Sequence, residues 1–205
     1  MVKNTFSEVS ADVPTTGEVD GVGRRTVIRA IAMSGCCLAA SGLISASPAI
    51  AQAKKVKPEP GQRFAHMAGD KEGQLVVPDD VKLGKPLLAY PMDATTTQVH
   101  GSRANLLILM RLNETDLEET MKPHAASGIV AYSGICTHEG CPISGEHENP
   151  RMALCNCHGS TFDLGANGKV IAGPATRRLA MLPVAITDGT LVVAGKLNGP
   201  IGPPA

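Results

Sequence analysis

Two short segments of the chain carry cysteine and histidine at spacings that suit a metal centre. The segments are Cys136-Thr137-His138-Glu139-Gly140-Cys141 and Cys155-Asn156-Cys157-His158. Together they supply two thiolates and two imidazoles in the pattern C-x-H-x16-C-x2-H, with Cys141 and Cys157 interleaved as a second cysteine pair. A [2Fe–2S] centre of mixed ligation binds thiolates on one iron and imidazoles on the other. The chemistry that this pattern indicates is one-electron transfer at such a centre.

Zinc is the alternative metal, because it also accepts two cysteines and two histidines. Zinc sites, however, typically use C-x2–4-C and H-x3–5-H pairs, whereas each motif here mixes one cysteine with one histidine. Zinc also gives no role to Cys141 and Cys157, and a purely structural set of disulfides leaves His138 and His158 unexplained. The spacing therefore favours an iron–sulfur centre over a zinc-binding module.

The motif resembles that of Rieske iron–sulfur proteins, specifically the disulfide-containing kind found in quinol:cytochrome c oxidoreductases and arsenite oxidase small subunits. The resemblance covers mainly residues 128–194 and implies one [2Fe–2S] cluster per chain. It implies three roles for the six residues: thiolate ligands of one iron, imidazole ligands of the other iron, and a disulfide that joins the two loops. In that order the pairs are Cys136 and Cys155, His138 and His158, and Cys141 and Cys157.

The resemblance also implies which residues surround the cluster. A Gly-Pro segment shields a third side of the cluster in the family, and Gly173 and Pro174 match it. In bc1-type relatives a serine and a tyrosine after the second histidine donate hydrogen bonds to cluster sulfurs. Here Ser160 is present, but Phe162 stands at the tyrosine position and has no hydroxyl. We therefore expect a redox potential below that of bc1-type relatives, yet above that of an all-cysteine cluster, which carries two more negative charges.

Hydrogen bonds and turns within the ligand loops can also be anticipated from the residue types. Thr137, like Ser160, can donate a hydrogen bond toward sulfur and so tune the potential. Gly140 and Gly159 permit the tight turns that the two loops need.

Composition excludes several other functions. The 205 residues include 19 basic and 19 acidic side chains, so no global charge directs the chain to nucleic acid or to an anionic membrane. Two tyrosines, three phenylalanines and no tryptophan are too few for a base-stacking platform. We find no nucleophile–base pair and no phosphate loop, so the sequence predicts an electron-transfer subunit of an oxidoreductase with no independent catalytic site.

The N-terminal region resembles a twin-arginine (Tat) signal peptide. Arg24 and Arg25 precede an uncharged stretch, residues 30–53, which is rich in small residues and offers A-x-A cleavage sites before Lys54. Its length also suits a retained membrane anchor. The resemblance implies export to the periplasm, an oxidising compartment that agrees with a disulfide.

The predicted fold class is all-β: a Rieske domain of stacked antiparallel sheets, with the cluster in a small subdomain at one tip. The predicted order is a signal peptide or anchor over residues 1–53, a linker over 54–73, the Rieske domain over 74–198 and a Gly/Pro tail over 199–205. Short apolar runs between turn residues predict strands. The runs are Gln74–Val77, Pro86–Tyr90, Leu106–Leu112, Gly128–Tyr132, Lys169–Ala172, Ala180–Ile186 and Leu191–Ala194.

Two segments that connect predicted strands also have sequence patterns that predict their local structure. Residues 187–190 read as a hairpin turn, because Asp-Gly lies between two of the predicted strands. Residues 113–123 are polar and acidic and are expected to form a helical insertion.

The expected function is periplasmic electron transfer, from a quinol-oxidising or dehydrogenase partner to a c-type cytochrome. Two narrower alternatives remain: the small subunit of an arsenite-oxidase-like molybdenum enzyme, and the Rieske subunit of a bc1-type complex beside a cytochrome b. The residues before Gly128 resemble arsenite oxidase small subunits somewhat more closely. Glu139 weighs against the bc1-type alternative, since a carboxylate is costly to bury in a quinone pocket. A Rieske oxygenase ferredoxin fits less well, because those proteins normally lack the disulfide cysteines.

Overall fold

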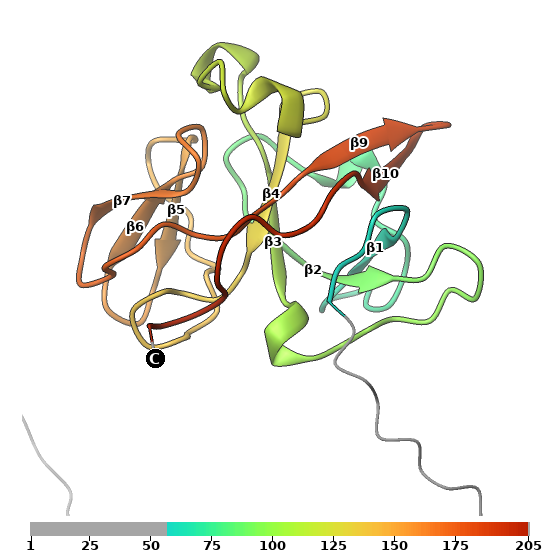
Figure 1. Ribbon diagram of the computed structural model, residues 1–205, viewed down its shortest axis with the longest axis horizontal. Coiled ribbons are helices and arrows are strands. Elements are labelled where there is room, and N and C mark those ends of the chain that lie inside the picture. The colour runs from blue at the N-terminus through green and yellow to red at the C-terminus, as the bar shows by residue number, and fades with distance from the viewer. Residues whose placement is uncertain (1–56, 205) are drawn as a thin grey trace, which may run out of the picture. The chain divides into compact units, whose positions relative to one another are not determined.

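Ten strands and four short 3-10 helices build the structure of residues 57–204, which is a computed structural model (Figure 1). The strands are β1 (Arg63–His66), β2 (Leu87–Met92), β3 (Leu107–Arg111), β4 (Ile129–Ser133), β5 (Met152–Cys155), β6 (Ser160–Asp163), β7 (Lys169–Ala172), β8 (Met181–Leu182), β9 (Val184–Thr187) and β10 (Thr190–Val193). The 3-10 helices are η1 (Pro78–Asp80), η2 (Arg103–Asn105), η3 (Glu114–Asp116) and η4 (Lys122–His124). The predicted all-β class with antiparallel sheets is confirmed.

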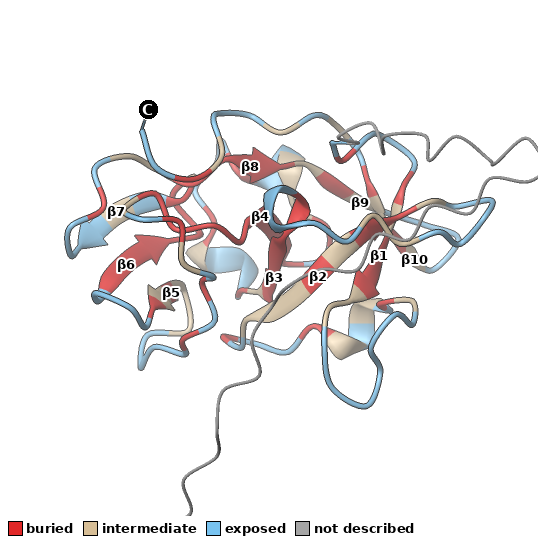
Figure 2. Ribbon diagram, turned by 90° about the horizontal axis from the view of Figure 1, so that it is seen from below, coloured by how far each residue is buried: buried red, intermediate tan, exposed pale blue. Residues whose placement is uncertain are grey.

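The strands form two sheets that lie side by side (Figures 1 and 2). The larger has seven strands in the order β8-β4-β3-β2-β1-β10-β9, and the smaller has three in the order β5-β6-β7. Every pairing between these strands is antiparallel. Figure 2 shows that β3, β4 and β6 are buried, whereas the outer strand β7 is largely exposed.

The central strands β3 and β4 hold the two sheets together because both of their faces are buried. Successive side chains of a strand point to opposite faces. Leu107 and Leu109 therefore pack into one apolar cluster, the body cluster, which draws only on the seven-stranded sheet and its loops. Ile108 and Met110 pack into a second cluster, the joining cluster, which also contains Phe162 of β6.

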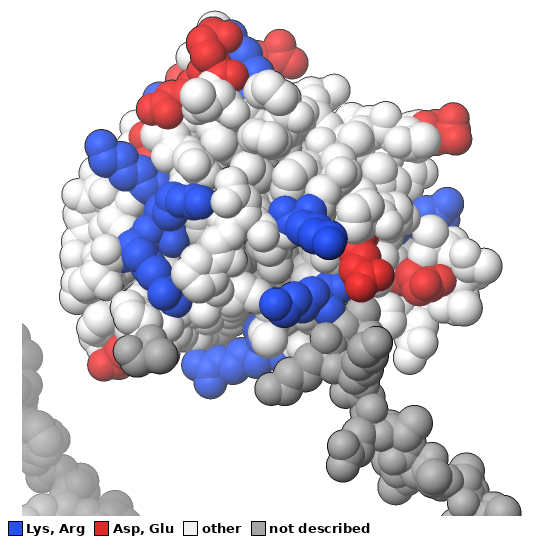
Figure 3. All heavy atoms as spheres, in the orientation of Figure 1, with Lys and Arg blue, Asp and Glu red and all other residues white. Residues whose placement is uncertain are grey.

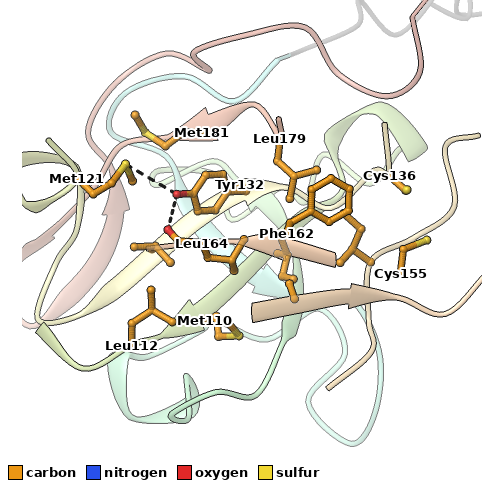
Figure 4. Close-up of a cluster of buried hydrophobic side chains, with 14 of the residues drawn as sticks. Met110, Leu112, Met121, Tyr132, Cys136, Cys155, Phe162, Leu164, Leu179 and Met181 are labelled. Carbon is orange, nitrogen blue, oxygen red and sulfur yellow. Dashed lines mark hydrogen bonds between the residues drawn. The ribbon is translucent and has the colours of Figure 1, made fainter. Parts of the chain in front are cut away.

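A buried tyrosine adds a polar link between the two sheets. Tyr132 on β4 is fully buried, and its hydroxyl donates a hydrogen bond of 2.6 Å to the Leu164 carbonyl just after β6 (Figure 4). A buried hydroxyl needs such a partner. The small sheet is therefore fixed to the large one by apolar packing and by a specific hydrogen bond.

Several predicted boundaries differ from the structure. Residues 63–66, predicted to lie in the linker, form β1 between β2 and β10, and Phe64 and Ala65 are completely buried. Their sequence, Arg-Phe-Ala-His, shows no period-two alternation, so pattern alone does not identify the strand. Gln74–Val77 contributes only an isolated bridge from Leu75 to Ala65. The predicted signal segment, residues 1–53, and the start of the predicted linker lie outside the described residues.

Other differences follow from local backbone chemistry. Strands β5 and β6 have no counterpart among the predicted strands. Both have only four residues and directly flank the second ligand segment, and β6 mixes polar with apolar side chains. Ala180–Ile186 is split into β8 and β9 around Pro183, which cannot donate a ladder hydrogen bond. The predicted helical insertion over residues 113–123 contains only 3-10 turns. The hairpin turn is confirmed: Asp188 and Gly189 both have positive φ, as a type I′ turn requires.

Within residues 57–204, no helix is long and apolar enough to cross a membrane.

Candidate iron–sulfur site

The two ligand segments form loops of the same construction at one end of the joining cluster. In the first loop, the backbone N–H of Gly140 donates to the Cys136 carbonyl at 3.0 Å. In the second, the N–H of Gly159 donates to the Cys155 carbonyl at 3.0 Å. Both glycines have positive φ, 77° and 74°, which residues with a Cβ rarely adopt. The expectation that both glycines make tight turns is confirmed.

Cys136 and Cys155 place two free thiols in the interior. Each residue is 1% exposed, and Figure 4 shows both at one end of the joining cluster, beyond Phe162. Burial raises the pKa of the Cys155 thiol, and the neighbouring Cys136 thiol raises it further. Two adjacent thiolates in this environment need a cation to offset their charge, and iron supplies one. The donor set therefore fits a thiolate-bound iron.

His138 and His158 lie at the surface with their rings nearly perpendicular, at an interplanar angle of 89°. Their Nδ1 atoms are 3.2 Å apart, so both imidazoles direct the same ring nitrogen toward a common point. Their Nε2 atoms lie on the outer side, each 4.0 Å from a carboxylate oxygen of Glu139. Two neutral imidazoles with converging nitrogens suit a shared metal, because each can supply a lone pair there.

The predicted disulfide between Cys141 and Cys157 is confirmed. It joins the end of the first ligand loop to the middle of the second, and its Cα atoms are 6.6 Å apart. The covalent bond holds the two loops in register across 16 residues of sequence.

The segment that carries Gly173 and Pro174 lies against the second loop. A Cβ on Gly173, where φ is 83°, would lie 2.5 Å from the Ser160 Cα, so only glycine allows this close approach. The backbone N–H of Ala175 donates to Ser160 Oγ at 3.1 Å. Since that oxygen acts as an acceptor in this bond, the hydroxyl proton of the fully buried Ser160 remains free to be donated.

Thr137 does not have the role expected from its type. Its hydroxyl donates a 2.6 Å hydrogen bond to the backbone carbonyl of Arg177, so its proton is not available to a sulfur. The bond instead fixes the first ligand loop to the segment that follows Gly173 and Pro174.

Two arginines that no local sequence motif marks support the first loop. Arg103 donates to the Gly140 carbonyl at 2.9 Å. Arg177 donates to the carbonyls of Gly202 and Pro203, the latter at 2.8 Å, and so holds the C-terminal segment in place. This segment, predicted as a Gly/Pro tail over residues 199–205, thus contacts the site as far as it is described: a Cβ built on Gly140 would lie 3.6 Å from Pro203.

Comparison with known proteins identifies the family. Residues 93–183 match the family model of the Rieske [2Fe-2S] domain. The chain is 36% identical over 160 residues to the cytochrome bc1 complex Rieske iron-sulfur subunit of Streptomyces lividans, covering 71% of this chain and 94% of that protein. This chain belongs to the Rieske iron–sulfur protein family. Membership implies a [2Fe–2S] cluster, for which the donor set described above is suited.

Two further proteins are similar to this chain, and the matched share of each chain differs between them. The chain is 33% identical over 211 residues to the protein of the same description from Streptomyces coelicolor, covering 96% of this chain. It spans 58% of the length of that relative. The soluble domain of the Rieske protein II from Sulfolobus acidocaldarius shares 27% identity, with a TM-score of 0.33 over 37% of this chain and 44% of that one. Neither Streptomyces relative is named as an arsenite oxidase subunit, so this comparison does not support the closer resemblance suggested by the residues before Gly128.

Proposed function

We propose that this Rieske protein transfers single electrons as a subunit of a bc1-type quinol:cytochrome c oxidoreductase. The observation that carries the proposal is the arrangement of the four candidate ligands. The thiols of Cys136 and Cys155 are buried, while the imidazoles of His138 and His158 converge at the surface. The Streptomyces relatives, which are named as bc1 complex subunits, support the choice of complex.

Each part of the site has a task in this function. Cys136 and Cys155 would hold one iron in the interior, and His138 and His158 would hold the other at the surface. The cluster supplies a one-electron couple whose potential is raised because neutral imidazoles replace two thiolates. The side chains of His138 and His158 are 27% and 47% exposed, so they form the edge through which an electron can enter or leave. The Cys141–Cys157 disulfide and the Gly173–Pro174 segment keep water from the remaining sides.

The partners and the compartment follow from the same proposal. A cytochrome b would present the quinol as electron donor, and a c-type cytochrome would accept the electron. The protein would work on the outer side of the cytoplasmic membrane after export by the Tat pathway, because a disulfide persists in an oxidising compartment. Whether residues 1–53 are removed or retained as an anchor decides if the domain is itself tethered to the membrane.

Metal content and spectroscopy test the site. The purified protein should contain two irons and two acid-labile sulfides per chain, and the reduced form should give a rhombic EPR signal. Cys155→Ala and His158→Ala should each abolish cluster assembly. His147→Ala is the matched control, since His147 is an exposed histidine between the two ligand motifs and should retain the cluster. Stoichiometric zinc without iron would overturn the proposal.

Two further experiments test the proposed partner subunit and the proposed export route. Affinity purification from the native membrane should recover a cytochrome b together with this chain. Recovery of a molybdenum-containing large subunit instead would favour an arsenite-oxidase-like complex. Replacement of Arg24 and Arg25 by lysine should leave the protein in the cytoplasm, and continued export of that variant would contradict the Tat assignment.

A further inference from the structure

Glu139 places a carboxylate across the outer edge of both candidate histidine ligands. Its Oε1 lies 4.0 Å from Nε2 of His138, and its Oε2 lies 4.0 Å from Nε2 of His158. The side chain is 64% exposed. Since the Nδ1 atoms of the two rings face each other, the Nε2 atoms form the outward edge, and the carboxylate spans that edge.

No cation among residues 57–204 neutralises this carboxylate by direct pairing. Among the same residues, the only basic groups within 4.0 Å of it are the imidazoles of His138 and His158, which would be neutral as metal ligands. Arg103 lines the same shallow hollow as Glu139 and Pro203, but its guanidinium is directed to the Gly140 carbonyl. A negative charge therefore remains exposed beside the edge through which electrons would pass.

We infer that Glu139 determines which redox partners can dock at this edge, and that the surface fits a partner that presents positive charge. The inference rests on the proposed electron-transfer function and adds the chemistry of the partner. Exposed charges act over about 10 Å at 0.1 M salt, so a carboxylate in contact with both imidazoles affects any partner that reaches them. A wholly apolar docking pocket is disfavoured, because it would bury the carboxylate without a partner.

Two small oxidants of opposite charge isolate this effect. The reduced holoprotein is mixed with tris(phenanthroline)cobalt(III), a cation, or with ferricyanide, an anion, and oxidation is followed by stopped-flow absorbance. One electron passes from each protein to one oxidant, the metal of the oxidant is reduced by one unit, and no bond forms or breaks. The ratio of the two rate constants reports local charge, because a change in the protein's potential alters the driving force for both oxidants alike.

Glu139→Gln removes the charge and keeps the shape. The ratio of the cobalt to the ferricyanide rate constant should fall about three- to tenfold at low ionic strength, and the fall should shrink as salt is added. Glu119→Gln is the matched control. It removes the same charge from the segment of η3 and η4, where acidic side chains gather at the top of the face drawn in Figure 3, away from the C-terminal segment that contacts the first loop.

The outcomes separate this inference from the proposed function. A ratio that falls in Glu139→Gln and not in Glu119→Gln, with the rhombic EPR signal intact, supports the inference. Equal ratios in the two variants would overturn it while electron transfer to both oxidants leaves the proposed function standing. Failure of the unaltered protein to carry a cluster would overturn both.

Discussion

The two sheets of this protein are stabilised in different ways. The seven-stranded sheet buries the body cluster, in which every member is apolar. The three-stranded sheet has an exposed outer strand, β7, and its central strand β6 buries the polar residues Ser160, Thr161 and Asp163. The larger sheet is therefore held mainly by apolar burial, and the smaller one depends on specific polar and covalent links.

The difference reflects what each region can bury. The smaller sheet has three strands of four residues each, and its outer strand β7 is largely exposed, so it buries little apolar surface of its own. Here it is held by the Cys141–Cys157 disulfide, by the Tyr132 hydrogen bond and by an ion pair in which Arg151 Nε donates to Asp163 at 2.5 Å. Such links let the site keep polar groups and glycine turns close to the candidate ligands. Substitutions in the seven-stranded sheet should therefore mainly lower the free energy of unfolding. Substitutions in the three-stranded sheet should mainly alter cluster retention and the redox potential.

The largest expected effect on stability lies in the seven-stranded sheet. Phe64 on β1 is completely buried in the body cluster, so Phe64→Ala should lower the free energy of unfolding by about 3–5 kcal/mol, from lost burial and the cavity that remains. Thermal or denaturant unfolding measures the loss. Val77→Ala, at a residue 41% exposed, is the control and should change stability by no more than about 0.5 kcal/mol.

The same variant also tests whether the two regions are separate. Where Phe64→Ala remains folded, its redox potential should equal that of the unaltered protein. A shifted potential would show that the seven-stranded sheet tunes the site, and the two sheets would then not control separate properties.

The second largest effect on stability is expected for the disulfide, which helps to hold the smaller sheet. Replacing Cys141 and Cys157 together by alanine removes the bond without leaving an unpaired thiol, and should cost about 2–4 kcal/mol for a loop of this length. Because the bond joins the ligand loops, the loss should appear first as faster release of iron and sulfide. The measurement is the rate of bleaching at a temperature below global unfolding.

The EPR spectrum sharpens that prediction. The variant should keep the rhombic signal while the cluster survives, since the bond lies outside the four candidate ligands. Unchanged bleaching rates, or free thiols at both positions in exported protein, would contradict the proposed role of the disulfide.

The features that could be predicted from the sequence depend on residues that are close together in the chain. The ligand spacing and the Asp188-Gly189 turn are local patterns, and the apolar runs of β2, β3 and β4 identify those strands. The contacts that support the first ligand loop, in contrast, join residues that are far apart in the sequence. Arg103 reaches Gly140 across 37 residues and Arg177 reaches Gly202 across 25, and nothing in either neighbourhood marks these contacts.

Arg177 should have a smaller effect than the disulfide. Arg177→Ala removes the hydrogen bonds to the Gly202 and Pro203 carbonyls, and we expect a loss of about 1–2 kcal/mol because these are partly exposed, charge-assisted bonds. Release of the C-terminal segment should speed its limited proteolysis and also speed cluster loss. Arg177→Lys keeps a donor and should recover part of both. Faster proteolysis with normal cluster retention would show that the segment does not support the site.

The smallest expected effect is on the redox potential, through the hydrogen bonds of the smaller sheet. The reduced cluster carries one more negative charge than the oxidised cluster, so a hydroxyl that donates to it stabilises the reduced form and raises the potential. Ser160 is fully buried and keeps a proton to donate, and Ser160→Ala should lower the potential. Phe162, also fully buried, lacks a hydroxyl, and Phe162→Tyr should raise the potential.

The size of both shifts follows from the free energy of a hydrogen bond. A net hydrogen bond contributes about 1 kcal/mol, and for one electron this corresponds to about 40 mV. Protein-film voltammetry of the unaltered protein and the two variants measures the shifts, with EPR to confirm that each cluster is intact. Phe162→Tyr is the more demanding test, because the added oxygen must find a partner in the joining cluster. If its potential stays unchanged with an intact cluster, hydrogen bonding from this position does not tune the site.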